Sequence, residues 1–388
     1  MHMKVLVGLS GGVDSAVAAY LLKEQGYDVT CCFMRNWDSF ANNDIAGNPT
    51  IQNDTCPQEQ DYMDAKAVAD KLGLPLQRVD YIKEYWDHVF STFLDEYKKG
   101  RTPNPDILCN KYIKFDSFYK RAMDLGFDAV ATGHYASTTF NHDFNYLTRA
   151  KDQNKDQTYF LCQVDQEAFQ HTLFPLGNLE KPKVREIAKK LELDSVSSKK
   201  DSTGICFIGE RNFRQFLSNY LPSKNGPIID IDTGKIVGQH VGVLYYTIGQ
   251  RKGLNISTER GPWFVIGKDV QSNILFVCHT SKQEWLYSDS CLVKGVNWLV
   301  PKDYQIPNQC TAKFRYRQAD QDVNIQIIDE TTVLVSYPQK IASVTCGQEA
   351  VFYDGNVCLG GGVIEEVYIH NEDLNQKIIS TYEDRKHG

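Results

Sequence analysis

The chain has 388 residues, which is more than one hydrophobic core usually organises, so we expect two or three domains. Hydrophobic residues make up 42% of the chain and no apolar run approaches the roughly 18 residues that cross a bilayer, which excludes a membrane-spanning protein and favours a cytoplasmic one. The net charge of −7 argues against binding to nucleic acid through overall charge.

The 11 cysteines are scattered and include no Cys-x-x-Cys pair. This pattern excludes a disulfide scaffold and a four-thiolate zinc site, and most of the thiols are expected to be reduced and buried.

The start of the chain predicts a strand, a turn and a helix. Val5–Val7 is a short apolar run, Ser10–Gly12 forms a turn, and Val13–Leu22 has helical spacing up to a stop at Gly26. The free N–H groups of a helix that follows a glycine-rich loop form an anion site. The spacing matches neither the Walker loop nor the dinucleotide fingerprint.

We therefore expect this loop, called here the phosphate loop, to bind an anion such as a phosphate. Its residues Ser10–Ser15 resemble the pyrophosphate loop of the ATP pyrophosphatase superfamily, which implies that the anion is the pyrophosphate of ATP. Its hydroxyls can donate hydrogen bonds, and Asp14 can hold a magnesium ion. The candidate ATP-binding residues are Gly8, Leu9, Ser10, Gly11, Gly12, Val13, Asp14 and Ser15. A plain strand–turn–helix without a ligand is the alternative.

Strands and helices then alternate to about residue 132. Further strands are expected at Asp28–Phe33, Leu76–Val79 and Ala129–Thr132, and helices at Pro57–Leu72, Glu84–Lys99 and Lys111–Leu125. The alternation predicts an α/β fold with a doubly wound parallel sheet, which binds ligands beyond the carboxyl ends of its strands. Met34 and Gly133 fall at such ends and are expected to contact adenine, while residues 38–56 form a long loop.

Two cysteines stand in unusual surroundings. Arg101–Asn110 contains two prolines and is expected to be a rigid loop, so that Cys109 lies at the start of the following helix, with Asp106 nearby as an acid or base. Cys206 lies among hydroxyls, lysines and glycine, which predicts a mobile, electropositive loop. Both thiols are candidates for reactivity, although an isolated cysteine is more often buried and inert.

Two segments are locally basic, Lys98–Arg121 and Lys181–Asp201, the second including a helix from Pro182 to Leu191. They are either solvated helix faces or the electrostatic footprint of a nucleic acid, and the sequence leaves both open.

The last part of the chain is rich in β-structure. Strands are expected at Ile228–Ile231, Val241–Tyr246, Phe264–Lys268, Ile274–Cys278, Cys310–Arg317, Val323–Ile327 and Val333–Val335. Cys310–Arg317 would carry three cations on one face, and Gly360–Gly362 would end the pattern. We expect a small β-rich central domain at 212–288 and a C-terminal antiparallel β-barrel at 289–388, after an ATP pyrophosphatase domain at 1–211.

With these motifs placed, the chain resembles the bacterial tRNA-specific 2-thiouridylases of the ATP pyrophosphatase superfamily along nearly its whole length. The motifs that carry the resemblance are Gly8–Ser15, Asn104–Asn110, Ala131–Tyr135, Lys155–Gln157, Gly204–Gly209, Phe314–Gln318, Phe352–Gly355 and Cys358–Gly361. The resemblance implies that ATP with Mg²⁺ adenylates the 2-carbonyl of the wobble uridine, and that sulfur from a protein persulfide then replaces AMP.

The resemblance also implies roles for single residues. Cys206 would carry the persulfide, Cys109 would free the sulfur by forming a disulfide with Cys206, and Asp106 would act as acid or base. Asn104, Pro105 and Asp106 would surround the target base, which must be flipped out of the anticodon loop. The implied tRNA contacts are His134, Lys155, Asp156, Gln157, Arg315, Tyr316 and Gln348. A sulfur-relay protein or cysteine desulfurase would supply the persulfide, and we expect a monomer with no stable metal.

Three alternatives remain open at this stage. One is a nitrogen-transferring ligase of the same superfamily, which needs no pair of thiols. Another is a non-catalytic, ATP-responsive RNA-binding protein. The third holds an iron–sulfur cluster on Cys109, Cys206 and Asp106, although usual clusters take four thiolates.

Overall fold

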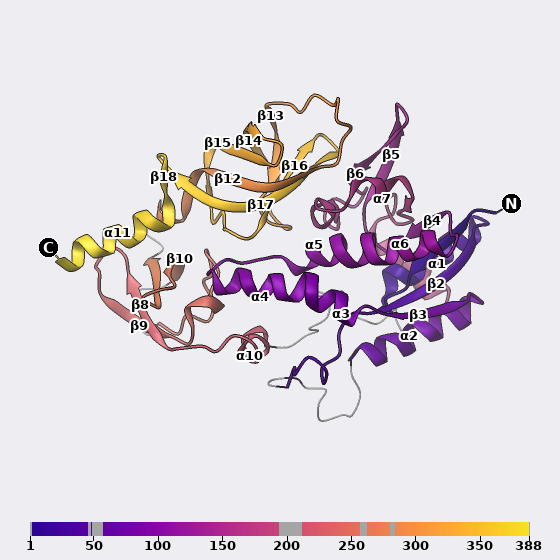
Figure 1. Cartoon of the computed structure of the whole chain (residues 1–388), viewed down its shortest axis with the longest axis horizontal. Coiled ribbons are helices and arrows are strands. Elements are labelled where there is room, and N and C mark those ends of the chain that lie inside the picture. Colours follow the sequence, from indigo (N-terminus) through magenta and orange to yellow (C-terminus); the bar gives the residue numbers. More distant parts are fainter. Residues whose placement is uncertain are drawn as a thin grey trace.

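The computed structural model describes residues 2–45, 48, 57–193, 212–256, 262–279 and 284–387. These residues form a parallel sheet with its helices, a smaller central sheet and a β-barrel (Figure 1). The phosphate loop and Cys109 are among them, whereas Cys206 and its motif lie outside the described residues.

The parallel sheet has five strands in the order β3-β2-β1-β4-β7. Their bounds are β1 Lys4–Gly8, β2 Asp28–Arg35, β3 Leu76–Asp80, β4 Ala129–Ala131 and β7 Thr172–Leu173. The central strand β1 is apolar and buried from Val5 onward, as expected for a strand covered on both faces. The prediction of a doubly wound parallel sheet is confirmed, although the short β7 was not expected.

Helices pack on both faces of this sheet and extend from it beneath the barrel (Figure 1). The helices and helical turns are α1 Val13–Glu24, α2 Pro57–Leu72, α3 Ile82–Tyr85, η2 Trp86–Phe90, α4 Ser91–Lys98, α5 Pro105–Cys109, η3 Asn110–Ser117, α6 Phe118–Asp124, η4 Thr158–Leu161, α7 Gln166–Gln170 and α8 Lys181–Lys190. The expected helix over 84–99 is one helical run, 82–98, with the π-helical segment η2 inside it.

The helix expected at Lys111–Leu125 begins six residues earlier, at Pro105. Proline is well suited to the first turn of a helix, and the Asn104 side chain caps this one by accepting from the Asp106 N–H. The prediction that Cys109 stands at the helix start was therefore wrong, because the helix passes through it into the π-helical η3.

The central sheet has the order β10-β11-β8-β9. Its elements are α10 Phe213–Ser218, β8 Gly226–Asp230, β9 Ile236–His240, η5 Val243–Tyr245, β10 Trp263–Asp269 and β11 Ile274–His279. The expected strand at Val241–Tyr246 is wrong, since Val243–Tyr245 is a 3₁₀ turn, and β9 was not predicted.

Six antiparallel strands close the barrel, because β12 pairs with both β15 and β17. Its strands and the following elements are β12 Tyr287–Trp298, β13 Gln309–Lys313, β14 Gln321–Asp329, β15 Thr332–Ala342, β16 Glu349–Asp354, β17 Val357–Ile369, β18 Glu372–Asp373 and α11 Leu374–His387. The predicted barrel is confirmed, but β13 ends at Lys313, and Gly360–Gly362 lies inside β17 instead of ending the pattern.

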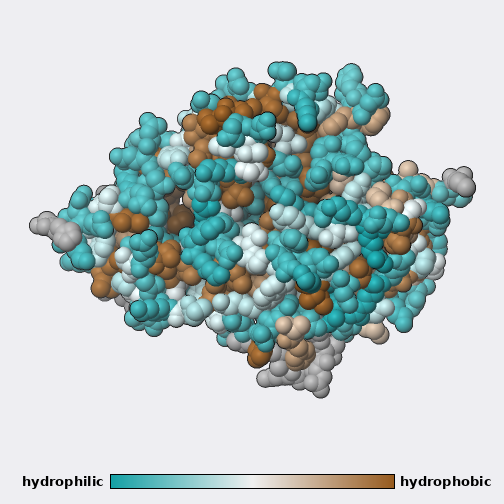
Figure 2. Space-filling view, in the orientation of Figure 1, coloured by the Kyte–Doolittle hydropathy of each residue, from teal (hydrophilic) through white to brown (hydrophobic). Residues whose placement is uncertain are grey.

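A hairpin that the sequence did not reveal, β5 Ser137–Asn141 and β6 Phe144–Thr148, connects the first part of the chain to the barrel. Thr148 of β6 pairs with Val357 at the start of β17. The face in Figure 2 is mostly hydrophilic, with a hydrophobic stretch over the barrel. Among the described residues, no helix is long and apolar enough to span a membrane.

Candidate functional site

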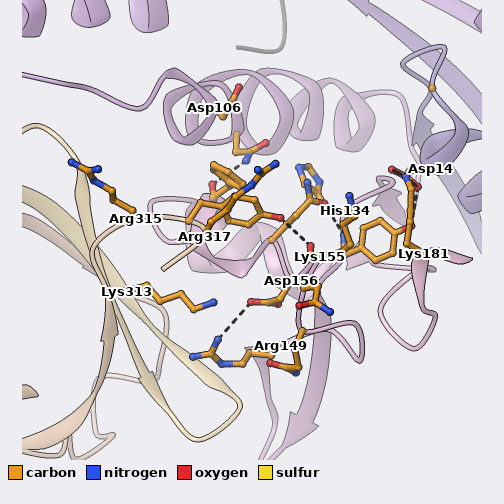
Figure 3. A pocket seen from close by; sticks show the side chains of 18 of the residues that line it. Asp14, Asp106, His134, Arg149, Lys155, Asp156, Lys181, Lys313, Arg315 and Arg317 are labelled. Carbon is orange, nitrogen blue, oxygen red and sulfur yellow. Dashed lines mark hydrogen bonds and ion pairs between the residues drawn. The ribbon is translucent and has the colours of Figure 1, made fainter. Parts of the chain in front are cut away.

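A cavity of about 1180 Å³ lies between the carboxyl edge of the parallel sheet and the barrel. Figure 3 shows Asp14 and Lys181 at one end, Lys313, Arg315 and Arg317 at the other, and Asp106 on the helix above. Seven lysines and arginines and five aspartates line it. The structure therefore brings the phosphate loop, Asp106 and the barrel residues of the Phe314–Gln318 motif to one space.

The phosphate loop is shaped by its own hydrogen bonds. The Ser10 N–H donates to the Ser15 hydroxyl over 3.1 Å, and that hydroxyl donates to the Gly12 carbonyl, also over 3.1 Å. Ser10 to Asp14 line the cavity at the N-terminus of α1, where backbone N–H groups and the helix dipole favour an anion. Gly8, Leu9 and Ser15 are buried and do not line the cavity.

Gly133 allows β4 to approach the phosphate loop closely. A Cβ atom at this position would lie 2.6 Å from the Ser15 nitrogen and 2.8 Å from the Asp14 carbonyl carbon, which is closer than backbone atoms tolerate. Met34 lies over Gly8, where its Cε would be 3.0 Å from an added Cβ. Both predicted adenine contacts therefore neighbour the loop, and a direct contact with adenine stays a prediction.

Lys181 is the main functional candidate that the sequence did not single out individually. Its ammonium lies 2.8 Å from both carboxylate oxygens of Asp14, and the Tyr135 hydroxyl donates to the same carboxylate over 2.9 Å. Lys181 is the first residue of α8 and its side chain is only 9% exposed, so the cation is directed at the phosphate loop. The basic segment at 181–201 was the available signal.

Asp106 and Cys109 lie on neighbouring faces of one helix. Asp106, Asn110 and Lys114 follow each other at intervals of four residues and line the cavity, as one face of a helix does. The Cys109 side chain is 2% exposed and packs in a core with Ile113. In this state the helix presents the Asp106 carboxylate to the cavity and keeps the Cys109 thiol beneath it.

His134 is buried on the wall of the cavity. Its Nδ1 lies 2.8 Å from the Thr132 hydroxyl and its Nε2 lies 3.4 Å from the Lys114 ammonium, which can only donate. We therefore assign the tautomer with the proton on Nδ1. Burial, with a further contribution from Lys114, places the pKa of His134 well below its usual value, so this imidazole is neutral.

Asp156 is a buried carboxylate. It accepts from the Thr158 hydroxyl over 2.7 Å and from the Ala150 N–H over 3.0 Å. Burial raises its pKa despite these hydrogen bonds. One Arg149 nitrogen lies 3.8 Å from Asp156 and the other donates to Asp320 of the barrel over 2.7 Å. Arg149 thus connects Asp156 to the barrel.

The other predicted tRNA contacts also bind other parts of the chain. Gln157 pairs with Tyr135, accepting from its N–H through the side chain and donating to its carbonyl from the backbone. The Tyr316 ring lies 4.3 Å from that of Phe160, and its hydroxyl is 3.3 Å from the Lys155 carbonyl.

Arg315 donates to the Ile248 carbonyl over 2.8 Å and to the Thr345 hydroxyl over 2.6 Å. Gln348 donates to the Thr102 carbonyl over 2.6 Å and does not line the cavity. The predicted contact of these residues with tRNA is not tested by these bonds.

Many cations of the two basic segments are paired on the surface. Lys98, Lys99 and Lys120 each pair with a carboxylate three or four residues away, and both Lys183 and Lys190 reach Glu186. This favours solvated helix faces for these side chains, whereas Lys114 and Lys181 face the cavity.

Burial raises the pKa of several other thiols, to about 12 for Cys346 and Cys358. These cysteines are expected to be inert. Among the described residues, no group of three or more His, Cys, Asp or Glu side chains could hold a metal ion. Because Cys206 is not described, the iron–sulfur alternative is not tested.

Three family models match the chain in succession. They are described as a tRNA methyl transferase HUP domain at residues 3–210, a tRNA methyl transferase PRC-barrel domain at 214–279, and an aminomethyltransferase β-barrel domain at 288–364.

Two similar curated proteins are both named tRNA-specific 2-thiouridylase. The one from Mycoplasma mycoides is 58% identical over 374 residues, which cover 95% of this chain and 100% of the relative. The one from Bacillus cytotoxicus is 50% identical over 372 residues, covering 96% of this chain and 97% of the relative.

Among solved structures, an NMN synthetase from Francisella tularensis covers 53% of this chain and 68% of its own, with 21% identity and a TM-score of 0.33. A 4-thiouridine synthetase in complex with RNA and ATP covers 53% of this chain and 45% of its own, with 16% identity and a TM-score of 0.32. At these TM-scores the likeness supports no conclusion about function.

Proposed function

This chain belongs to the family of tRNA-specific 2-thiouridylases, and we propose that it uses ATP to replace the 2-oxygen of a wobble uridine in tRNA by sulfur. The observation that carries the mechanism is the cavity of about 1180 Å³, which joins the phosphate loop to Asp106 and to the cations of the barrel. A cavity of this size has room for ATP and a flipped nucleotide together. We also propose that the ATP pyrophosphatase domain, the central domain and the barrel domain are divided at about residues 211 and 288.

ATP is proposed to bind at the end formed by Ser10–Asp14. The N–H groups of this loop and the Lys181 ammonium would hold its phosphates, with adenine towards Met34 and Gly133. The carboxylates of Asp14 and Asp61 line the same cavity and are suitable ligands for Mg²⁺, which would neutralise phosphate charge. Lys181 can pass from Asp14 to a phosphate, leaving this carboxylate for the metal.

The first step makes a leaving group. The 2-oxygen of the uracil attacks the α-phosphorus of ATP, pyrophosphate leaves, and the oxygen becomes part of a bound AMP. Asp106 lines the cavity and is proposed to move the proton of the base, with Asn104 and Pro105 fixing the turn that presents it. The neutral His134 and the Lys155–Gln157 segment would surround the flipped nucleotide.

The second step brings the sulfur. Cys206 is proposed to carry it as a persulfide, received from a sulfur-relay protein or a cysteine desulfurase. The Cys109 thiolate attacks the Sγ of Cys206, the outer sulfur becomes the new substituent on C2, and AMP leaves. The product is a Cys109–Cys206 disulfide, which an external thiol must reduce before the next turnover. Since Cys109 is buried beneath the cavity, this step requires the helix to expose it.

The proposal is tested in a reconstituted reaction. The reaction contains purified protein, a tRNA transcript with a wobble uridine, ATP, Mg²⁺ and a persulfide donor. Mass spectrometry of the digested nucleosides should show 2-thiouridine, and AMP and pyrophosphate should form in equal amounts. Asp14→Ala should abolish tRNA-dependent release of pyrophosphate. Release of pyrophosphate without thiolation would instead point to another ligase of the superfamily, and the absence of both products would refute the proposed function.

A further inference from the structure

The segment that leads into the helix of Asp106 is held by other parts of the protein. The segment Gly100 to Thr102 ends four residues before Asp106, and two of the next three residues are prolines that offer no backbone donor. The segment belongs to no sheet of its own. The N–H groups of Gly100 and Arg101 donate to carbonyls at the end of α4, so the other backbone groups must find partners elsewhere.

The barrel and the central sheet supply these partners. The Thr102 N–H donates to the Cys346 carbonyl over 3.0 Å, and the Thr102 carbonyl accepts from the Gln348 side chain over 2.6 Å. On the other side, the Lys268 ammonium of β10 donates to the Gly100 carbonyl over 2.9 Å. Lys268 is buried, and burial lowers its pKa to about 7, so the contact lies in a dry junction.

An ion pair between Arg101 and Glu365 of β17 adds a second connection. The two guanidinium nitrogens donate to the two carboxylate oxygens over 2.8 and 2.6 Å, a bidentate geometry that fixes orientation as well as distance. Both side chains are largely covered, at 21% and 26% exposed. The hydrogen bond from Arg101 holds the pKa of the Glu365 carboxyl below its usual value.

The backbones of the two segments are in close contact at Gly347. A Cβ atom there would lie 2.8 Å from the Thr102 nitrogen and 2.9 Å from the Arg101 Cβ. Gly347 also has φ +90°, which an L-residue with a side chain rarely adopts. The barrel therefore touches the entry to the helix directly, without an intervening layer of side chains.

We infer that Gln348 and Glu365 are positioning residues for the thiolation reaction. Gln348 acts through Thr102 and Glu365 acts through Arg101, and together they fix the position of Asp106 on the cavity wall. The inference rests on the proposed function and assigns Gln348 a role other than the predicted tRNA contact. The barrel also supplies Arg315 and Arg317 to the cavity. One rigid body would thus fix both the RNA-facing wall and the acid or base.

Single-turnover thiolation at saturating tRNA and ATP tests this inference with Gln348→Ala and Glu365→Gln. Glu366→Gln is the matched control, because its carboxylate lies next along β17 and bonds to Tyr368 on the same strand. We expect a rate 10- to 100-fold below wild type for both test variants, since small displacements of a reacting group cost about this much. The dissociation constants for ATP and tRNA should stay within about twofold, and the control should match wild type.

Exchanging the charges of Arg101 and Glu365 tests whether the ion pair itself restores the rate. Arg101→Glu alone should be slow, and combining it with Glu365→Arg should recover most of the rate. Gln348→Ala removes one hydrogen bond only, which keeps the test available if Glu365 variants fold poorly.

A weaker affinity of Gln348→Ala for tRNA, with an unchanged rate at saturation, would overturn the inference in favour of a direct tRNA contact. Variants as fast as the control would also overturn it, while the wild-type activity would still support the proposed function. A wild-type protein that makes no 2-thiouridine would refute that function itself.

Discussion

Replacement of Lys181 by methionine keeps most of the unbranched side chain and removes its terminal ammonium and charge. The ammonium lies 2.8 Å from both oxygens of Asp14, where a gross attraction of about 6 kcal/mol follows for an effective dielectric constant near 20. Most of it is offset by desolvation, and Asp14 is 33% exposed and can recover water. We expect the free energy of unfolding to fall by about 1–3 kcal/mol.

The loss of activity should be larger than the loss of stability. If Lys181 transfers its charge from Asp14 to the phosphates, its removal takes a fixed cation from the transition state. Removal of one such group usually costs about 10²- to 10³-fold. We expect kcat/KM for ATP in tRNA-dependent pyrophosphate release to fall by this factor, with tRNA affinity unchanged.

Lys183→Met is the matched control for this experiment. Lys183 lies two residues further along α8 and pairs with Glu186 over 3.0 Å, with both side chains about half exposed. It should retain wild-type kinetics. If Lys181→Met keeps kcat/KM within about threefold of wild type, Lys181 only balances Asp14 in the free protein and the assignment to ATP phosphates is wrong.

Three further predictions concern other positions. Gly133→Ala should lower ATP affinity and destabilise the fold by about 1–3 kcal/mol, measured by ATP titration and denaturant unfolding, because its Cβ meets the Ser15 backbone; wild-type affinity would contradict this. The depressed pKa of His134 means that the unfolded chain binds a proton that the folded one does not, so stability should fall below pH 6.5 by at most about 1.4 kcal/mol per pH unit. His134→Asn should reduce the dependence of the free energy of unfolding on pH, measured by denaturation at pH 7, 6 and 5. An equal dependence in the variant and the wild type would refute this prediction. Cys109→Ala and Cys206→Ala should each abolish thiolation, and a trapping reagent should find a persulfide that persists on Cys206 when Cys109 is absent; wild-type thiolation by Cys109→Ala would refute the paired mechanism.

The sequence predicted elements whose signals are local. The apolar run at Val5–Val7, the glycines before α1 and the periodicity of α2 each specify a structure within a few residues. The start of the helix at Pro105 was missed because two prolines and a glycine were interpreted as a loop, although proline at the first helical position supports a start. The strand through Gly360–Gly362 was missed because close packing against β12 and β16, not local preference, places glycine there.

The site was predictable as a set of motifs but not as a set of contacts. Asp14 and Asp106 were singled out from their neighbours in sequence, and both line the cavity. The pairing of Asp14 with Lys181 spans 167 residues and has no sequence signal beyond a basic helix. Residue type alone also could not show that Asp156 is buried, because an aspartate is usually exposed. Its buried environment is created by distant parts of the chain, including Arg149 and the barrel.

The walls of the cavity are separated by about 300 residues of chain, from Ser10 to Asp320. At about 5–20 residues per second, the ribosome needs roughly 15–60 s to pass from the phosphate loop to the last lining residue. During that interval a nascent chain has the nucleotide end of the site without the wall that carries Lys313 and Arg317. A chain stopped within the barrel would therefore present the proposed ATP site without the cations proposed to face RNA, so truncation should abolish tRNA-dependent turnover before it abolishes binding of the nucleotide.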